Sequence, residues 1–185
     1  MPPKTISFRK PLFRLLLIGL ILSLIPLFCA CDSGTKKVKV PKTAPDFTLK
    51  TLDGQTLTRD GLKGKVVLLD FWATWCPPCR AAIPHLITLY NNYKDQGLIV
   101  VGISLDQGDQ SDVSDFVKRN QIPYPIAMGH GNPIVKDMGN VTSLPTLIIL
   151  DQQSEIKFKV VGFNAEIGQK IEHKLRQLLE QKQQR

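Results

Sequence analysis

The sequence predicts an α/β fold in which helices cover a mixed central sheet. Two apolar runs rich in branched residues, 66–72 and 98–104, have the composition of buried strands, and a helical stretch separates them. Two further strand-like runs, 146–150 and 156–161, follow each other closely enough to pair as a closing hairpin. Strand–helix alternation followed by a hairpin indicates that parallel and antiparallel strands share one sheet.

A hairpin and a long helix are indicated on the N-terminal side of this core. Residues 47–51 and 56–58 have strand-like composition and flank an Asp-Gly pair that ends at Gly54, which is typical of a tight turn. The helix after the first core strand begins at a pair of cysteines and extends to about Lys94. Gly97 ends it, because glycine readily takes the left-handed conformation at a helix C-terminus.

Between the second core strand and the closing hairpin, the sequence predicts a central βα insertion. It contains a helix at 112–119 with Ser111 as its N-cap, an extended piece at 123–126 and a brief helix at 134–138. A last helix, capped by Asn164, follows the closing hairpin. The chain of 185 residues has room for one such domain and a targeting segment.

Two cysteines, Cys76 and Cys79, open the first long helix in the motif Trp-Cys-Pro-Pro-Cys-Arg. A disulfide between them would close a very small ring and remove little conformational entropy from the unfolded chain, so its value as a structural bridge is low. The spacing therefore favours redox chemistry, in which Cys76 attacks a partner disulfide and Cys79 resolves the mixed disulfide.

The position of this pair predicts two unequal thiols. Pro77 and Pro78 stand in the first turn, where the helix has no internal use for an N–H group. The Cys76 sulfur is thus expected at a helix N-terminus, where free N–H groups and the helix dipole can lower a thiol pKa to roughly 3.5–7.5. Cys76 is predicted to be the exposed, attacking thiol, and Cys79, one turn further in, to be more buried and less acidic.

Four short motifs occur along the chain in a specific combination. They are Ala-Pro-Asp-Phe-Thr-Leu at 44–49, Leu-Lys-Gly-Lys at 62–65, Asp-Phe-Trp-Ala-Thr-Trp-Cys-Pro-Pro-Cys-Arg at 70–80 and Leu-Pro-Thr at 144–146. Together they resemble the thioredoxin superfamily and, within it, the membrane-anchored TlpA/ResA-like thiol-disulfide oxidoreductases. The resemblance covers about residues 41–180 and implies a thioredoxin-like fold for a domain at 43–185.

The resemblance implies an enzyme that exchanges disulfides with protein thiols and receives electrons from a membrane or periplasmic donor, with no cofactor and no metal. It favours reduction of client proteins, and c-type apocytochromes are plausible clients by analogy alone. It further implies that Leu144 and Pro145 form a cis peptide facing the cysteines. These two residues would bind the client together with Trp75 and Pro77. Trp75 as the rim of a docking groove and Trp75 as an ordinary packing residue remain equal alternatives.

One departure from the family pattern directs attention to Asp70. TlpA/ResA-like proteins usually carry a glutamate three residues after the second cysteine, where this chain has Ala82. Asp70 lies in the apolar run that leads to the cysteines, where thioredoxins keep a buried aspartate. A buried carboxylate is costly without a role or a partner. Asp70 is therefore predicted to accept the proton of Cys79, in preference to being only a hydrogen-bonded polar group at a strand end.

The first thirty residues predict export from the cytoplasm. Basic residues without any acidic one precede an apolar stretch at 15–28, and the small residue Ala30 follows it. This pattern is typical of a signal peptide of the lipoprotein type at 1–30. The alternative is an uncleaved membrane helix over about residues 12–30. Both place the following residues outside the cytoplasm at the inner membrane, because the positive flank stays inside.

Cys31 is the predicted site of a lipid anchor in the cleaved form. Two acyl chains on this cysteine would give stable attachment to the membrane, and residues 31–42 would serve as a flexible tether. Cleavage would remove Cys29 and acylation would occupy Cys31. Cys76 and Cys79 would then be the remaining free thiols.

Composition and motif spacing argue against other functions. The net charge of +8 falls to +4 once the four basic residues of the first thirty are set aside, and no aromatic-interleaved basic patch indicates nucleic acid. A peroxidase of the peroxiredoxin type would need proline and threonine where this chain has Leu69 and Ala73. A copper carrier of this fold would need one more residue between the cysteines and a distant histidine; His85, His130 and His173 are interpreted as surface residues.

Overall fold

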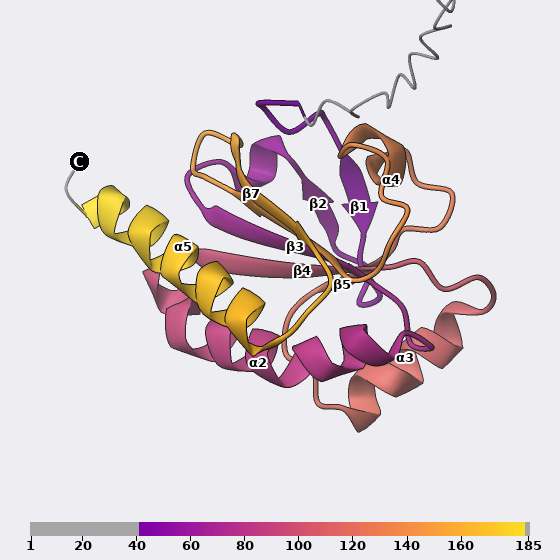
Figure 1. Cartoon of the computed structure of the whole chain (residues 1–185). Coiled ribbons are helices and arrows are strands. Elements are labelled where there is room, and N and C mark those ends of the chain that lie inside the picture. Colours follow the sequence, from indigo (N-terminus) through magenta and orange to yellow (C-terminus); the bar gives the residue numbers. More distant parts are fainter. Residues whose placement is uncertain (1–40, 184–185) are drawn as a thin grey trace, which may run out of the picture. The chain divides into compact units, whose positions relative to one another are not determined.

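The computed structural model describes residues 41–183 (Figure 1). The predicted signal peptide at 1–30, the lipidation site Cys31 and all but the end of the tether at 31–42 lie outside the described residues. Within residues 41–183, no helix has both the length and the apolar composition needed to cross a membrane.

A five-stranded mixed sheet forms the centre of the described domain. Its strands are β3 (Val66–Trp72), β4 (Leu98–Ser104), β5 (Ile126–Met128), β6 (Thr146–Leu150) and β7 (Ile156–Val161). They lie in the order β5-β4-β3-β6-β7. The central strand β3 runs parallel to β4 and antiparallel to β6, while β5 is parallel to β4 and β7 antiparallel to β6. The predicted mixed sheet with a closing hairpin is thus confirmed.

Three helices cover one face of this sheet (Figure 1). They are α2 (Pro77–Tyr93), α3 (Gln110–Arg119) and α5 (Ala165–Gln183). Alternate residues of β3, among them Leu68 and Trp72, point toward this face and join the helices in one buried apolar cluster. After α2, the short 3-10 turn η3 (Lys94–Gln96) ends at Gly97, whose positive φ of 102° confirms the predicted glycine stop.

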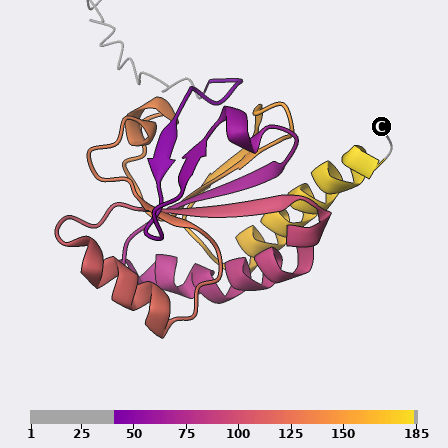
Figure 2. The ribbon, with the colours of Figure 1, turned by 180° about the vertical axis from the view of Figure 1, so that it is seen from behind.

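The predicted N-terminal hairpin covers the opposite face together with a short helix (Figure 2). These elements are β1 (Thr48–Lys50), β2 (Thr56–Thr58), the 3-10 turn η2 (Asp60–Leu62) and α4 (Ile134–Asp137). The other set of β3 residues, including Val67 and Leu69, packs against them. The Leu52 N–H donates to the Ile126 oxygen at 2.7 Å, so the chain after β1 pairs with the outer edge of β5. A sheet edge that would otherwise be open is thereby partly closed.

Two boundaries in the central insertion differ from the sequence prediction. The N-cap of α3 is Asp109 and not Ser111: the Asp109 carboxylate accepts the Ser111 N–H at 2.9 Å, and α3 begins at Gln110. The strand β5 begins only after Pro123 and Pro125, because proline has no N–H to give to the ladder.

The active-site end of the sheet is set by the register of its central strands. Phe71 of β3 pairs with Thr146, the first residue of β6, and Trp72 pairs with Ser104, the last residue of β4. The segments that follow β3 and β4 and the segment that precedes β6 therefore lie together at one end of the sheet, beyond the ends of these strands. The predicted catalytic and client-binding positions beyond β3 lie on these connections or in the first turn of α2, which follows the first of them.

Candidate active site

Cys76 and Cys79 are joined by a disulfide at the start of α2, with an S–S distance of 2.05 Å. Cys76 is the N-cap of the helix and has extended backbone angles, and prolines follow in the first turn as predicted. The Cys79 N–H donates to the Cys76 sulfur at 3.3 Å. The sulfur thus meets an N–H group that has no partner within the helix. This confirms the predicted placement of Cys76 at a helix N-terminus.

The two sulfurs differ in exposure, but less than the sequence suggested. Cys79 is completely buried, as expected, whereas Cys76 keeps 4% of its surface accessible. The prediction of an exposed Cys76 is therefore wrong for the disulfide form, because the cysteine belongs to the same apolar cluster as α2 and α5. The neighbouring Trp75 is 67% exposed and Pro77 is exposed, so a client can approach beside the disulfide.

Leu144 and Pro145 form a cis peptide, as the family resemblance implied. Pro145 immediately precedes β6. It lies at the end of the sheet from which the cysteine loop leaves, since Thr146 pairs with Phe71. The Pro145 oxygen accepts the Gly162 N–H at 2.7 Å. Pro145 is buried and Leu144 half-buried, which leaves part of Leu144 at the surface of this edge.

Asp70 is buried in the middle of the central strand. It is 1% exposed, and its side chain points to the same face as Leu68 and Trp72, whose apolar cluster contains Cys79. Its Oδ1 atom has no hydrogen-bond partner among the described residues. Desolvation raises the pKa of this carboxyl to about 7, because burial penalises the charged form. Asp70 is therefore not the satisfied strand-end group of the alternative interpretation.

The residues that pair with Asp70 in the sheet supply neither a charged side chain nor a side-chain hydrogen-bond donor for the buried carboxyl group. Asp70 lies between Gly102 on β4 and Leu147 on β6. A Cβ atom added at Gly102 would lie 2.4 Å from Ile126 Cδ1 and 3.0 Å from Trp72 Nε1, so the space beside Asp70 is closely packed. The Trp72 indole N–H also lacks a partner in the described part of the chain. Ala82, which replaces the family glutamate, is fully buried in the same cluster.

A second carboxylate at this site was not identified from the sequence. Asp106 follows β4 and accepts hydrogen bonds from the Thr74 N–H at 3.0 Å, the Thr74 hydroxyl at 2.6 Å and the Ser104 hydroxyl at 2.7 Å. Thr74 lies two residues before Cys76. Ser104 and Asp106 are recognisable as polar residues at the end of an apolar strand. No local pattern, however, indicates which loop their side chains contact.

A groove beside the disulfide lies between the cysteine loop and α3. Thr74, Trp75 and Arg80 line one side, and residues of α3, including Phe116, line the other. The Arg80 guanidinium lies 5.9 Å from the centre of the Phe116 ring, and Phe116 packs against Trp72 with 5.4 Å between ring centres. Arg80 thus contacts an aromatic face, which links the start of α2 to α3.

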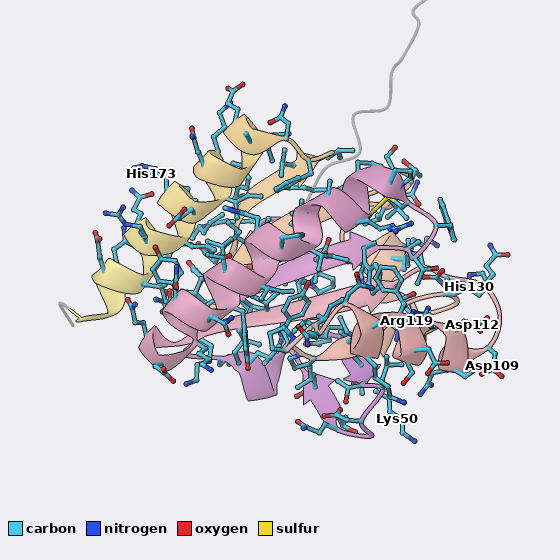
Figure 3. All side chains as sticks on the ribbon, turned by 90° about the horizontal axis from the view of Figure 1, so that it is seen from below. Lys50, Asp109, Asp112, Arg119, His130 and His173 are labelled. Atoms are coloured by element: carbon cyan, nitrogen blue, oxygen red, sulfur yellow. A yellow bond between two sulfur atoms is a disulfide. The ribbon has the colours of Figure 1, made fainter. Side chains whose placement is uncertain are left out.

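The histidines and acidic residues of the described chain form no metal site. Residues 41–183 contain no group of three or more His, Cys, Asp or Glu side chains able to hold a metal ion. His130 and His173 are exposed and lie on separate segments, as Figure 3 shows together with Asp109, Asp112 and Arg119 along α3. His85 is half-buried, and its Nε2 atom lies 3.2 Å from the Gly168 oxygen of α5.

Comparisons with known proteins agree with this geometry. Residues 40–159 match the AhpC/TSA family. The chain is 31% identical to the thiol-disulfide oxidoreductase ResA of Bacillus cereus over 83% of its own length and 89% of the relative, and 32% identical to ResA of Oceanobacillus iheyensis over 84% and 80%. The crystal structure of a protein assigned as the thiol:disulfide interchange protein DsbE of Chlorobium tepidum superposes with a TM-score of 0.70 at 28% identity. That superposition covers 76% of this chain and 98% of the other.

The buried Asp70 predicts an unusual dependence of stability on pH. Its pKa is raised in the folded state, so the native protein binds the proton more strongly than the unfolded chain does, and stability falls as pH rises from about 4 to about 7. The slope contributed by one group is at most about 1.4 kcal/mol per pH unit. We expect Asp70→Asn to lose this decline and to be more stable than the unmodified protein above about pH 7.

The measurement is denaturant unfolding of the oxidised protein, in which the cysteines do not titrate. Asp112→Asn, an exposed carboxylate on α3, is the matched control and should keep the pH dependence of the unmodified protein. Equal slopes for Asp70→Asn and the unmodified protein would show that Asp70 titrates normally.

Proposed function

Because the chain belongs to the AhpC/TSA family of thioredoxin-like proteins and is a thiol-disulfide oxidoreductase of the ResA and DsbE type, we propose that it reduces client disulfides outside the cytoplasm. The observation that carries the proposal is the Cys76–Cys79 disulfide at the N-terminus of α2, where the Cys76 sulfur accepts the Cys79 N–H. Of the two sulfurs, only Cys76 is in part accessible to a client.

Reduction of a client begins from the dithiol form of the pair. The Cys76 thiolate attacks one sulfur of the client disulfide, a mixed disulfide forms, and the other client sulfur leaves as a thiolate. The Cys79 N–H and the dipole of the helix terminus stabilise the Cys76 thiolate, both before the attack and as a leaving group. Cys76 is therefore the attacking thiol of the proposal.

Cys79 completes the exchange from its buried position. Its thiol gives a proton to Asp70, and the resulting thiolate attacks the Cys76 sulfur. The Cys76–Cys79 disulfide forms, and the second client sulfur leaves and takes up a proton from the surroundings. The client gains two electrons and the chain loses two, so a thiol-bearing electron donor must restore the dithiol. An Asp70 pKa of about 7 suits a base that accepts and returns a proton near neutral pH.

The client would bind as an extended segment at the end of the sheet that carries the cysteine loop. Leu144 and Pro145 immediately precede β6, at the end of the sheet from which the cysteine loop leaves, and the backbone groups of Leu144 beyond the strand ladder would pair with an extended client segment. Trp75 and Pro77, the neighbours of Cys76 in the chain, are both exposed. We assign these four residues to client binding, with Trp75 as the rim of the docking groove.

Exchange with proteins fits this site better than the peroxidase alternative. Leu69 is fully buried in β3 and Ala73 is fully buried at the start of the loop, so neither supplies the polar group that a peroxide-binding loop of the peroxiredoxin type requires. The hydroxyl of Thr74 is engaged by Asp106. A peroxide consumption assay tests the alternative directly, and turnover matching that with protein disulfides would favour it.

The proposal includes c-type apocytochromes as clients and attachment of the enzyme to the outer face of the inner membrane. The apocytochrome haem site is a Cys-x-x-Cys-His segment, whose intramolecular disulfide must be reduced before haem attachment. Export and anchoring follow from the sequence pattern at 1–30 and from Cys31. These assignments rest on the family resemblance and on the sequence.

Replacement of each cysteine separates their roles. We expect Cys79→Ser to accumulate mixed disulfides with client proteins, because the resolving thiol is missing, and Cys76→Ser to accumulate few. Non-reducing gel electrophoresis of trapped adducts is the measurement. Adducts that form mainly with Cys76→Ser would assign the attack to Cys79.

Removal of the proposed base should slow the resolving step in a pH-dependent way. Above the Asp70 pKa, Asp70→Asn should reduce the rate of mixed-disulfide resolution by about 10²-fold. Below that pKa the two rates should converge, since Asp70 is then protonated in the unmodified protein as well. Stopped-flow tryptophan fluorescence against an oxidised client measures the rates, with Asp95→Asn, an exposed carboxylate on η3 after the C-terminus of α2, as control. A ratio that does not change with pH would remove Asp70 from the mechanism.

The direction of exchange is tested by the reduction potential of the Cys76/Cys79 couple. A disulfide reductase should equilibrate near thioredoxin, at about −270 mV, and far from strong periplasmic oxidants at about −120 mV. Titration of the Cys76/Cys79 couple against glutathione or dithiothreitol buffers gives the potential. A potential near the oxidants would reverse the direction.

Client preference is tested in the same protein: an oxidised Cys-x-x-Cys-His peptide should be reduced faster than the same peptide with alanine in place of histidine.

Anchoring is tested on the full chain in its native cell envelope. We expect a labelled fatty acid to be incorporated into the unmodified protein, to be absent from Cys31→Ser, and to accompany membrane association. A protein that stays membrane-bound and unlabelled at its full length would instead support an uncleaved membrane helix.

A further inference from the structure

One carboxylate joins the loop that carries the cysteines to the neighbouring strand. Asp106 receives the backbone N–H of Thr74 at 3.0 Å on Oδ2 and the Thr74 hydroxyl at 2.6 Å on Oδ1. The same N–H lies 3.3 Å from Oδ1, so the two carboxylate oxygens enclose Thr74. These contacts connect residues 32 positions apart in the chain.

The carboxylate is itself held in place from the strand side. The Ser104 hydroxyl donates to Asp106 Oδ2 at 2.7 Å and accepts the Asp106 N–H at 3.1 Å. Ser104 is fully buried at the end of β4, opposite Trp72 in the sheet register. Next to it, the Leu105 N–H donates to the Trp72 oxygen at 2.8 Å. Asp106 is thus fixed to the part of the sheet from which the cysteine loop departs.

The contact with Thr74 restrains the backbone that places the Cys76 sulfur. Thr74 is followed by the exposed Trp75 and then by Cys76, whose N–H donates to the Ala73 oxygen at 3.2 Å. This short turn sets the direction in which the Cys76 side chain leaves the loop. The Cys76 sulfur must remain over the Cys79 N–H to keep the hydrogen bond of 3.3 Å.

We propose that Asp106 is a positioning residue for the nucleophile: by binding Thr74 it holds the Cys76 sulfur against the Cys79 N–H at the start of α2. This inference rests on the proposed function, because it assumes that Cys76 is the attacking thiol. Asp106 touches neither the disulfide nor the client. Its effect passes through Thr74 to the thiolate that Cys76 forms after reduction.

The direction in which Asp106→Asn shifts the Cys76 pKa distinguishes a positioning role of Asp106 from a direct effect of its negative charge. Other charged groups on the elements around the loop are Arg80 on α2, Asp112, Asp115 and Arg119 on α3, and Asp70 on β3. Removing a negative charge near a thiolate by itself lowers the thiol pKa. Loss of the ordered Cys79 N–H donor has the opposite effect, because the thiolate loses its hydrogen bond. Positioning therefore predicts a raised Cys76 pKa in Asp106→Asn.

The test compares four variants of the full chain in the reduced state. Asp106→Asn cannot satisfy all three donors with a single carbonyl oxygen. Thr74→Val removes the hydroxyl donor without changing any charge, and Thr74→Ser restores it. Asp112→Asn removes one exposed negative charge from the same groove and is the matched control. The readout is the pH dependence of alkylation at Cys76, which mass-spectrometric fragmentation of the peptide that carries both cysteines separates from alkylation at Cys79.

We expect Asp106→Asn to raise the Cys76 pKa and to slow alkylation at about pH 6 by about tenfold, since the rate follows the thiolate fraction. Thr74→Val should show a smaller change of the same sign. Thr74→Ser should match the unmodified protein, and Asp112→Asn should leave the pKa unchanged or lower it. An Asp106→Asn profile that coincides with Asp112→Asn, or a pKa that falls, overturns the positioning role.

This outcome can be told apart from failure of the proposed function. If Cys76 is not the attacking thiol, the unmodified protein itself will show preferential alkylation of Cys79 at low pH. If only the positioning role is wrong, the unmodified protein will show an acidic Cys76 and the Asp106 and Thr74 variants will retain it. Circular dichroism of each oxidised variant establishes that the fold is kept.

Discussion

The Cys79 N–H at the start of α2 has no carbonyl partner within the helix, and the Cys76 sulfur accepts its hydrogen bond. A sulfur in this position is more stable as a thiolate, because the helix terminus carries partial positive charge. The rest of the site serves to keep this arrangement. The cysteine loop follows the central strand β3. Pro77 and Pro78 occupy the first turn of α2, where an N–H group would have no partner within the helix. Asp106, which follows β4, accepts the Thr74 N–H of the loop.

Two carboxylates lie close to the cysteine loop in opposite environments, and the difference assigns them different tasks. Asp106 is half-buried and receives hydrogen bonds from Thr74 and Ser104, so it is suited to fixing a backbone. Asp70 is fully buried with an unpartnered oxygen and a pKa raised to about 7. A group of that kind costs stability when charged and exchanges its proton near neutral pH. Ala82 stands on α2 where the family resemblance implies a glutamate, and the proposal assigns the proton transfer to the carboxylate of Asp70, whose side chain points to the face that contains Cys79.

The mixed sheet brings these groups together. β3 and β4 are parallel, so their C-terminal ends deliver the cysteine loop and Asp106 to the same edge. β6 is antiparallel to β3, so its N-terminal end delivers Leu144 and Pro145 there as well. The proposed nucleophile, the proposed positioning carboxylate and the proposed client-binding backbone thus come from three distant parts of the chain. The helices on one face bury Cys79 and Asp70, while the loop edge leaves Trp75 available to a client.

The sequence by itself determined the order of the elements, the mixed sheet, the helix that begins at Cys76, the Asn164 cap and the buried position of Asp70. These features depend on periodicity, spacing and local turn chemistry, which act between near neighbours in the chain. The tertiary structure alone decided that Asp70 Oδ1 has no hydrogen-bond partner among the described residues and that Cys76 is nearly buried. It also decided that Asp109 caps α3 and that Asp106 binds Thr74, 32 residues away. Such contacts depend on which loops the sheet register brings side by side, and no local pattern in the sequence records that distance.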